Sequence, residues 1–487
     1  MSTFLHSPSQ IINPLAQQRR FGFGSAVTGG DLLPEVLTYR DAVTAAGGTI
    51  AANDLAALNT WAVRGTTAGW LAKMKEIWPM MGSTLAGAAV KMRYGAGAQA
   101  SLDVSRLVSG DYSQANGLGM TTRTSTKYVT TGFTPSLDSL SLTNFSCVTT
   151  NLDATLYKAV SGNYMGDTPA SGQNKLVFVQ ANNNNSASPS GYVGSQGYSP
   201  YLGVNGPACH VMNWGSNSQQ VFRNGWQMYY ATDAISGTLD SEINIGRMRS
   251  GGVYYVDVFR LGLIAFGSVL TTAEATDLGQ ATYEFQRSIS RTLLSGSYDL
   301  FVGDSITAGQ GANTFEQSFQ YLIANTRGKK PLCFGNPGAQ TRQDSSARNG
   351  IYQQRAALAN YSPARIYYMA GTNDAQYDGV LNGNATVAAD FKAKLKECVQ
   401  LWQGYGHEVI LMTLCYSTNT NINTTKQDMY ATAVLDAASE TGAGVVNINA
   451  LMRASSSPTP AAMMADATHP NATGHSFIAT SVAAAYP

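Results

Sequence analysis

The chain has 487 residues, of which 44% are hydrophobic and 13% are charged. This length predicts two or three domains, and the low charge excludes a largely disordered chain. The 31 Lys and Arg residues are balanced by 30 Asp and Glu residues, so the concentrated positive charge typical of a nucleic-acid-binding protein is missing.

The N-terminal part divides into an arm and a helical region. Residues 1–30 have the polar, irregular composition of an arm, without the basic and apolar segments of a secretory signal, so we expect no export signal. Over residues 31–99 apolar side chains recur every three or four positions, and glycines separate the segments. This spacing predicts two or three short helices, the last over "TAGWLAKMKEIWPMMG".

Residues 100–294 have the pattern of an all-β domain. Short runs rich in Val, Thr, Tyr and Phe alternate with Gly, Asn and Ser clusters, which predicts a β-sandwich. The run at 181–191 predicts a polar loop, and "TTAEATDLGQATYEFQRSIS" predicts a closing amphipathic helix. The most apolar window is interrupted by Asp257 and Arg260, so we expect a soluble protein without membrane insertion.

Residues 295–487 alternate between strand-like and helical segments. Helical patterns separate the apolar runs, which predicts a parallel sheet covered by helices on both faces. In such sheets, binding and catalytic sites lie beyond the carboxyl ends of the strands. The predicted strands are "YDLFVG", "LCF", "RIYYMAG", "EVILMTL" and "GVVNINA".

The cysteines are few and scattered. Their number is odd and no C-x-x-C pair occurs, so neither a zinc site nor a disulfide framework is indicated. We expect each to be a small buried side chain. The five are Cys147, Cys209, Cys333, Cys398 and Cys415.

Four polar blocks follow predicted strands of the C-terminal region or lie near the C-terminus. Ser305 lies in "GDSIT", Gly338 in "NPGAQT" and Asn373 in "GTND". Asp466 and His469 lie three residues apart in "DATHP". Acyl transfer by a serine requires a nucleophile, a base, a carboxylate that orients the base, and donors for the oxyanion, and these blocks supply each.

The four blocks, in this order, resemble those of the SGNH/GDSL-type hydrolases over residues 296–487. The resemblance implies a flavodoxin-like three-layer α/β/α fold and hydrolysis of esters or thioesters, without a metal or organic cofactor. It implies that Ser305 is the nucleophile, His469 the general base and Asp466 the residue that orients His469. The oxyanion hole would comprise the N–H groups of Ser305 and Gly338 and the side-chain amide of Asn373.

Some of these assignments have rivals in the same segments. "FGNPGAQT" contains Gly335 as well as Gly338, so the sequence leaves the oxyanion glycine open between them. His475, six residues after the predicted base, either replaces that base or packs within the terminal helix. Gly309 and Gly311 are expected to shape a loop that leaves the site open.

Four further residues flank the blocks. We expect Asp304 and Asp374 to brace the loops by hydrogen bonds rather than to take part in the reaction. Arg342 and Tyr377 follow two of the blocks and are candidate substrate contacts. No G-x-S-x-G sequence occurs, which excludes the nucleophile elbow of the α/β-hydrolases.

The β-rich region resembles a concanavalin/laminin-G-like jelly roll over about residues 100–290. The residues that carry the resemblance are Gly246-Arg247, the Tyr254/Tyr255 run and the segment "VLTTAEATDL". Such modules bind glycans or serve as spacers, so the resemblance implies one of these two roles.

Two segments are similar to modules of bacteriophage tail proteins, namely "LLPEVLTYRDAVTAAGGTIAANDLAALNTWAVR" and "GMTTRTSTKYVTTGFTPS". This similarity implies a virion protein, or one found outside the cell after lysis. Tail proteins are often trimers, but no long heptad region occurs here, so the oligomeric state and any virion partners stay open.

Together these observations predict an esterase that removes O-acetyl groups from a bacterial surface polysaccharide. The expected partner is an acylated carbohydrate. The alternatives are a glycan-binding structural virion protein with little or no hydrolysis, and a lipase or thioesterase that acts on longer acyl chains.

Overall fold

The computed structural model describes most of the chain. The expected arm at 1–30, most of the expected polar loop at 181–191, and Gly246 lie outside the described residues. No helix in the part described is long and apolar enough to cross a membrane. The described ranges are 32–96, 100–120, 127–141, 143–152, 164–165, 176–179, 190–193, 196–198, 208–232, 242–245, 247–250, 253–256, 259–291, 298–342, 350–361, 364–379 and 383–487.

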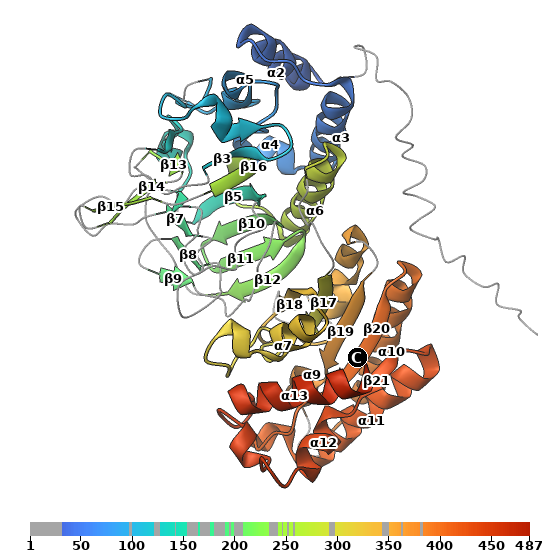
Figure 1. Cartoon of the computed structure of the whole chain (residues 1–487). Coiled ribbons are helices and arrows are strands. Elements are labelled where there is room, and N and C mark those ends of the chain that lie inside the picture. Colours follow the sequence, from blue (N-terminus) through green and yellow to red (C-terminus); the bar gives the residue numbers. More distant parts are fainter. Residues whose placement is uncertain are drawn as a thin grey trace, which may run out of the picture.

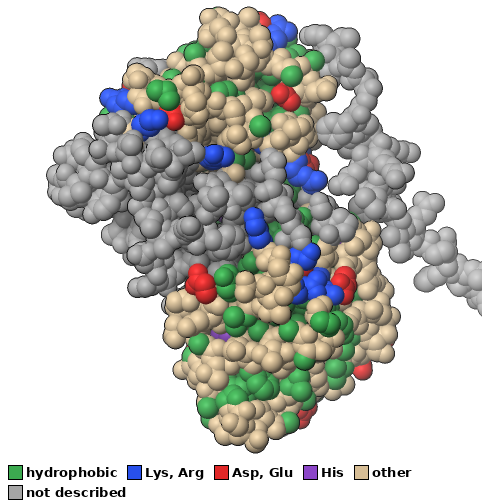
Figure 2. Space-filling model, in the orientation of Figure 1, with side chains coloured by type: hydrophobic (Ala, Val, Ile, Leu, Met, Phe, Trp, Pro, Cys, Tyr) green, Lys and Arg blue, Asp and Glu red, His purple; other side chains and the backbone are tan. Residues whose placement is uncertain are grey.

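Figure 1 shows two halves, an N-terminal half up to residue 291 and a C-terminal half from residue 298. Charged side chains of both signs are scattered over the face that Figure 2 shows.

The helices and short 3-10 turns of the N-terminal half are α2 (Pro34–Ala45), α3 (Ala52–Ala68), α4 (Trp70–Lys73), α5 (Leu85–Ala89), η1 (Ser109–Asp111), η2 (Pro135–Asp138) and α6 (Thr272–Ser288). Its strands are β1 (Met74–Trp78), β2 (Tyr112–Ser113), β3 (Gly117–Met120), β4 (Val129–Thr130), β5 (Asn144–Asn151), β6 (Tyr164–Met165), β7 (Leu176–Val179), β8 (Ser190–Val193), β9 (Gln196–Tyr198), β10 (Ala208–Gly215), β11 (Ser218–Arg223), β12 (Trp226–Ala231), β13 (Asn244–Ile245), β14 (Arg247–Ser250), β15 (Val253–Val256) and β16 (Phe259–Gly267).

The strands of this half form antiparallel sheets. One sheet has the order β12-β11-β10-β5-β16-β3-β2 with β1 beside β16, and the other has the order β4-β13-β6-β7-β8-β9. Val129 and Ile245 from the second sheet share one buried apolar cluster with Met212, Trp214 and Phe266 from the first. The expected antiparallel, β-rich character is therefore present, while the jelly-roll assignment stays a prediction.

The prediction of a third helix is wrong for the second part of its segment. The helix α4 ends at Lys73, and the next residues form β1, which pairs antiparallel with β16. Ile77 and Trp78 are fully buried there. Backbone pairing with a strand almost two hundred residues further along overrides the local helical spacing, because periodicity in a short segment is a weak signal.

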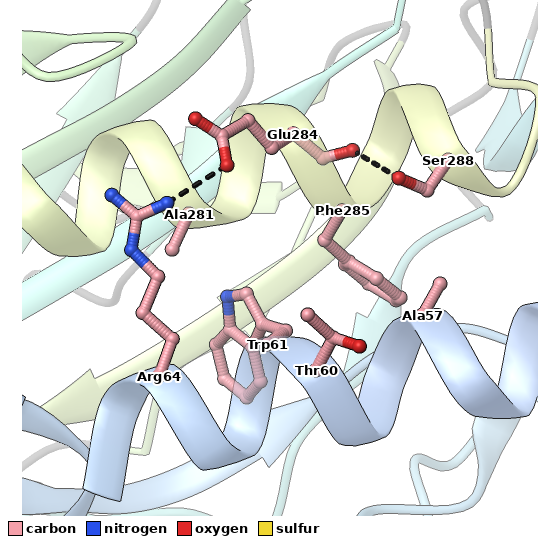
Figure 3. A pocket seen from close by; sticks show the side chains of 8 residues that line it. All are labelled: Ala57, Thr60, Trp61, Arg64, Ala281, Glu284, Phe285 and Ser288. Carbon is pink, nitrogen blue, oxygen red and sulfur yellow. Dashed lines mark hydrogen bonds and ion pairs between the residues drawn. The ribbon is translucent and has the colours of Figure 1, made fainter. Parts of the chain in front are cut away.

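The N-terminal helices are anchored to the β-region through α6, the helix expected to close it. Trp61 of α3 donates from its indole N–H to the Thr282 hydroxyl of α6 at 3.0 Å. Arg64 of α3 forms ion pairs with Asp277 and Glu284 of α6 at 2.7 and 2.8 Å. Figure 3 shows Trp61, Arg64 and Glu284 among the side chains that line a small cavity of about 40 Å³ between the two helices.

The C-terminal half contains one parallel sheet of five strands in the order β18-β17-β19-β20-β21. Its strands are β17 (Tyr298–Gly303), β18 (Lys330–Gly335), β19 (Arg365–Ala370), β20 (Glu408–Thr413) and β21 (Gly444–Val446). Its helices and 3-10 turns are η3 (Phe315–Gln317), α7 (Phe319–Thr326), α8 (Ile351–Gln354), η4 (Arg355–Asn360), α9 (Thr372–Gln376), α10 (Ala385–Gly404), η5 (Thr420–Ile422), α11 (Thr424–Thr441), α12 (Ile448–Ala454), η6 (Ala461–Met463) and α13 (Ala472–Ala485).

Helices cover both faces of this sheet, as the alternating pattern predicts. Leu300 and Val302 of β17 belong to the buried cluster that includes residues of α10 and α11. Phe301, between them in sequence, belongs to the opposite cluster with residues of α7 and α13. Each strand is therefore buried on both sides, which is why these strands appear in the sequence as nearly continuous apolar runs.

The two halves are in direct contact through the hairpin of β11 and β12. Trp226 of β12 is fully buried within the core of the C-terminal half and meets Phe334 of β18 edge-on at 5.5 Å between ring centroids. Asn224 donates from its side chain to the Tyr361 hydroxyl, and the backbone N–H of Gln227 donates to a Gln side chain of α8. The hairpin therefore contributes to the core that packs against β18, the outermost strand of the parallel sheet.

All five cysteines lie in the described part of the chain, where they are buried and form no disulfide bond. The expectation of small buried side chains is confirmed. Burial raises the pKa of these thiols, to about 12 for Cys209 and to about 11 for Cys333. They are therefore protonated at neutral pH and poor nucleophiles.

Candidate active site

The predicted site residues gather at the carboxyl edge of the parallel sheet. β17 lies between β18 and β19, so Ser305 after β17 is flanked by the loop that carries Gly338 and by α9, which carries Asn373. His469 comes from the loop between η6 and α13. Four segments that are far apart in the sequence thus meet at one edge, where open α/β sheets place their sites.

Ser305, His469 and Asp466 form a continuous series of hydrogen bonds. The Oγ atom of Ser305 lies 3.0 Å from Nε2 of His469. Nδ1 of the same imidazole lies 2.8 Å from Oδ2 of Asp466. With Nδ1 protonated and donating to the carboxylate, Nε2 is free to accept the proton of the serine hydroxyl.

The backbone of the turn 466–469 holds the Asp466 carboxylate in place. Its Oδ1 atom accepts the N–H groups of Thr468 and His469, both at 2.7 Å. Partial burial alone would raise the pKa of Asp466, but these two backbone bonds and the bond from the imidazole together lower it below its ordinary value. The carboxylate is therefore ionised at neutral pH and can stabilise an imidazolium.

Asn373, on α9, connects the loop after β18 with the segment that carries Ser305. Its side-chain Nδ2 donates to the carbonyl of Ala339 at 3.1 Å and makes a long 3.5 Å contact with Oδ2 of Asp304. Gly338, next to Ala339, has a φ of +79°, a conformation that favours glycine. Asn373 therefore contacts the residue that follows Gly338 and the residue that precedes Ser305, which brings the two oxyanion-hole candidates into the neighbourhood of the serine.

The other glycine of this loop has a different role. Gly335 is the last residue of β18, and a Cβ there would lie 2.3 Å from the backbone nitrogen of Ala308, in the turn after Ser305. Its missing side chain lets two backbone segments pack together. This leaves Gly338, at the tip of the turn, as the better oxyanion candidate.

Asp304 and Asp374 are both buried and hydrogen-bonded to loop backbone. Oδ1 of Asp304 accepts the N–H of Ile306 at 2.9 Å, and burial raises the pKa of Asp304. Asp374 accepts the N–H groups of Thr341 and Arg342 at 2.8 and 3.3 Å, and burial raises its pKa as well. Their contacts are those of loop-bracing side chains.

The two candidate substrate contacts differ in exposure. The Arg342 guanidinium is mostly buried and its Nε forms an ion pair with Asp374 at 3.3 Å. Tyr377, one helical turn after Asn373, is 56% exposed. Tyr377 therefore presents an accessible aromatic face near the site, whereas Arg342 is engaged in holding the loop after β18.

His475 does not reach the serine. It is fully buried, its Nδ1 accepts the N–H of Phe319 at 3.3 Å, and its Nε2 donates to the carbonyl of Gln310 at 3.2 Å. Its ring also stacks on Phe319 with 5.8 Å between centroids. Burial lowers the pKa of His475 to about 4. The histidine next to Ser305 is His469, so the structure favours the first of the two candidate bases.

Gly311 has a role that sequence reasoning missed. Its φ is +95°, and a Cβ at this position would lie 2.0 Å from the carbonyl oxygen of Pro470 and 3.4 Å from Cβ of His469. The serine loop and the histidine loop therefore touch at Gly311. Gly311 is therefore a point of close approach between the two loops, and nothing in its place in the sequence reveals this contact.

No group of three or more His, Cys, Asp and Glu residues suited to a metal ion occurs in the ranges that the structure describes. The donors around Ser305 are an imidazole, carboxylates and amides that already bind one another. What this arrangement can do chemically is to activate a serine and bind a developing negative charge.

Part of the C-terminal half is similar to known proteins. Residues 301–477 match the model of the GDSL-like lipase/acylhydrolase family. A search of curated proteins found no match.

Similar solved structures cover this part of the chain. A protein from Lactobacillus plantarum is 18% identical and matches 39% of this chain and 96% of its own, with a TM-score of 0.32. A lipolytic G-D-S-L family member from Veillonella parvula is 15% identical over 39% of this chain and 98% of its own, with a TM-score of 0.32. An acetylxylan esterase from Geobacillus stearothermophilus is 23% identical over 38% and 92%, with a TM-score of 0.30. Residues 301–477, which lie in the C-terminal half, are therefore similar to the GDSL-like lipase/acylhydrolase family.

Proposed function

We propose that the chain is a serine esterase that removes acyl groups, acetyl above all, from a carbohydrate. The observation that carries this proposal is the series of hydrogen bonds from Ser305 Oγ through the His469 ring to the Asp466 carboxylate. Such a series activates a serine hydroxyl, which is otherwise a weak nucleophile at neutral pH.

In the first half-reaction, Ser305 Oγ attacks the ester carbonyl while Nε2 of His469 takes the hydroxyl proton. The negative charge that develops on the carbonyl oxygen is bound by the N–H groups of Ser305 and Gly338 and by the Asn373 amide. His469 then returns the proton to the leaving sugar oxygen. The products of this step are the free sugar hydroxyl and an acyl-enzyme on Ser305.

In the second half-reaction, His469 accepts a proton from a water molecule that attacks the acyl-enzyme. The same oxyanion donors stabilise the second tetrahedral intermediate, and the proton passes to Ser305 Oγ as the acyl–oxygen bond breaks. The product is the free carboxylic acid, acetate for an acetyl ester, and the enzyme is regenerated. Asp466 remains ionised throughout and stabilises the imidazolium.

The carbohydrate part of the proposal is supported by the rest of the chain. The β-rich region resembles concanavalin/laminin-G-like jelly rolls, of which some bind glycans, and two segments resemble modules of tail or other structural proteins of bacteriophages. The exposed Tyr377 offers an aromatic face of the kind that packs against sugar rings. We therefore propose an O-acetylated bacterial surface polysaccharide as the substrate.

The test is acetate release from a panel of acetylated bacterial polysaccharides, with Ser305→Ala as the control. We expect release by the wild-type chain from at least one member and none by the variant. Binding of a polysaccharide without acetate release would instead favour the structural, glycan-binding alternative.

The preferred acyl length is a separate question with its own measurement. The proposal predicts that kcat/KM for a series of aryl esters falls as the acyl chain lengthens beyond acetyl. A maximum at long acyl chains, or faster cleavage of a thioester than of its oxygen ester, would favour the lipase or thioesterase alternative.

We also propose that the protein belongs to a virion and forms trimers, on the basis of the tail-module resemblance. Light scattering of the purified protein should then give three times the chain mass of 51.6 kDa. A mass equal to that of one chain would contradict the trimer.

A further inference from the structure

The turn that carries Asp466 and His469 is held from outside by the loop after β20. The carbonyl of Ala467, in the middle of this turn, accepts three hydrogen bonds. The Ser417 hydroxyl donates at 2.7 Å, the Thr418 N–H at 2.9 Å and the Asn419 N–H at 3.1 Å. The backbone between the base and its carboxylate is therefore fixed by three donors of one loop.

The buried side chain of Gln427, on α11, fixes that loop in turn. Its Nε2 donates to the carbonyl of Ser417 at 2.8 Å, and its Oε1 accepts the N–H of Ser417 at 3.3 Å. The same Nε2 donates to the carbonyl of Ile422 at 2.7 Å. The Gln427 amide thus pairs with both backbone groups of Ser417, as a neighbouring β-strand would. Because it also binds Ile422, one side chain holds both ends of the loop.

The orientation of the Gln427 amide is set by two residues of α12. Nδ2 of Asn449 donates to its Oε1 atom at 2.9 Å, and NH2 of Arg453 donates to the same oxygen at 3.2 Å. The oxygen therefore faces three donors and the nitrogen faces two carbonyls. A flipped amide would place donors against donors, so the side chain has one arrangement.

We propose that Gln427 is a positioning residue for the proposed esterase: it acts through Ser417 and Ala467 to hold His469 at reaction distance from Ser305. This inference rests on the proposed function. The relay is short, because Ser417 alone stands between Gln427 and the turn. It bears on rate because a shift of about 1 Å between reacting groups can lower kcat about 10²-fold.

The test compares three variants of the full chain with an aryl acetate as substrate. Gln427→Met keeps a side chain of similar volume but removes every hydrogen bond of the amide, and we expect kcat to fall about tenfold to a hundredfold with KM nearly unchanged. Ser417→Ala removes one of the three donors to Ala467 and should lower kcat by a smaller factor. The double variant should be no slower than Gln427→Met, because the two residues act in series.

His407→Met is the matched control. His407 is also buried and also joins two backbone groups, the N–H of Ala364 and the carbonyl of Leu358. It precedes β20, at the opposite end of the strand from Ser417. This variant should lower the unfolding temperature but leave kcat per active site, counted by titration with a serine-directed phosphonate, close to that of the wild type.

The pH profile separates positioning from stability. A loosened Asp466–His469 pair stabilises the imidazolium less, so the acid limb of kcat/KM should move to lower pH in Gln427→Met and Ser417→Ala and stay in place in His407→Met. A wild-type enzyme that is active, together with an unmoved limb and an unchanged kcat per active site in both variants, would overturn the positioning role alone. A wild-type chain without esterase activity would overturn the proposed function, and the inference with it.

Discussion

At the scale of single residues, the site depends on polar groups that hold one another in place. Asn373 contacts both the Ala339 carbonyl and the Asp304 carboxylate, which holds its amide next to the residue that precedes Ser305. A donor fixed before the reaction begins stabilises the transition state without a cost of reorganisation.

Replacing Asn373 by Ala tests this. We expect kcat for an aryl acetate to fall about 10²–10³-fold, because one preorganised donor to the oxyanion is lost. The measurement is steady-state kinetics on protein whose folding is checked by circular dichroism. A well-folded variant with wild-type kcat would show that the Asn373 amide does not bind the oxyanion.

The buried His475 predicts a pH dependence of stability. Its pKa is lowered to about 4 by burial, against about 6.5 in an unfolded chain, so the unfolded state binds more protons between these values. The contribution of neutral His475 to the free energy of unfolding is therefore fully present above about pH 6.5. It is lost as the pH falls toward 4, by up to about 1.4 kcal/mol per pH unit.

The measurement is urea unfolding of the wild type and of His475→Gln between pH 4 and 7. The variant should be less stable at pH 7, because the bonds to Phe319 and Gln310 are lost or weakened, but its stability should fall less steeply with acid. Equal slopes for both proteins would contradict a neutral, buried His475.

At the scale of elements, the serine loop and the histidine loop form one unit because they meet at Gly311. A Cβ there would overlap the Pro470 carbonyl, next to His469. The contact involves the backbones of both loops, so a displacement of either loop would also move Ser305 or His469.

Gly311→Ala should therefore lower kcat about tenfold or more, since it displaces His469 as well as straining a left-handed backbone. Gly328→Ala is the control: Gly328 also has a positive φ, of +63°, but no atom lies within 4 Å of its added Cβ. We expect the control to lose stability and keep its kcat. Equal kcat values for the two variants would contradict a catalytic effect of the Gly311 contact.

The sequence predicts most strands of the C-terminal half for a physical reason, but "GVVNINA" is a strand only over Gly444–Val446, and α12 begins at Ile448. Strands buried on both faces, such as "YDLFVG" and "EVILMT", are apolar runs that end in loop residues, so their order and their carboxyl ends can be recognised. The strand β1 could not be predicted in this way, because its partner β16 is distant and its own spacing is helical.

The candidate site was predictable only as far as its residue types are diagnostic. Ser305, Asn373, Asp466 and His469 stand in a recognisable order, and the structure brings their segments together. Gln427 and Gly311 carry no such signal, since a glutamine on a helix is usually exposed and a loop glycine usually serves a turn. Their roles depend on what lies across from them in space.

At the scale of the whole molecule, the two halves share a core at the hairpin of β11 and β12. Trp226 belongs by sequence to the N-terminal half and by packing to the C-terminal half. The C-terminal half therefore depends for its stability on a residue that the matched family segment does not include.

Trp226→Ala should destabilise the C-terminal half by about 3–5 kcal/mol, the usual cost of deleting a buried aromatic side chain. The measurement is the temperature at which esterase activity is lost. Trp214→Ala, in the cluster between the two antiparallel sheets, should leave that temperature higher than Trp226→Ala does. If Trp226→Ala loses activity at the wild-type temperature, the halves are not coupled in this way.

The central claim, that Ser305 is an activated nucleophile, is tested most directly by covalent labelling. A serine-directed fluorophosphonate is incubated with the wild-type chain and with Ser305→Ala, and the modified residue is located by peptide mass spectrometry. We expect one adduct per chain, on Ser305, and none on the variant. An unlabelled wild-type chain, or an adduct that persists on another residue in Ser305→Ala, would contradict it.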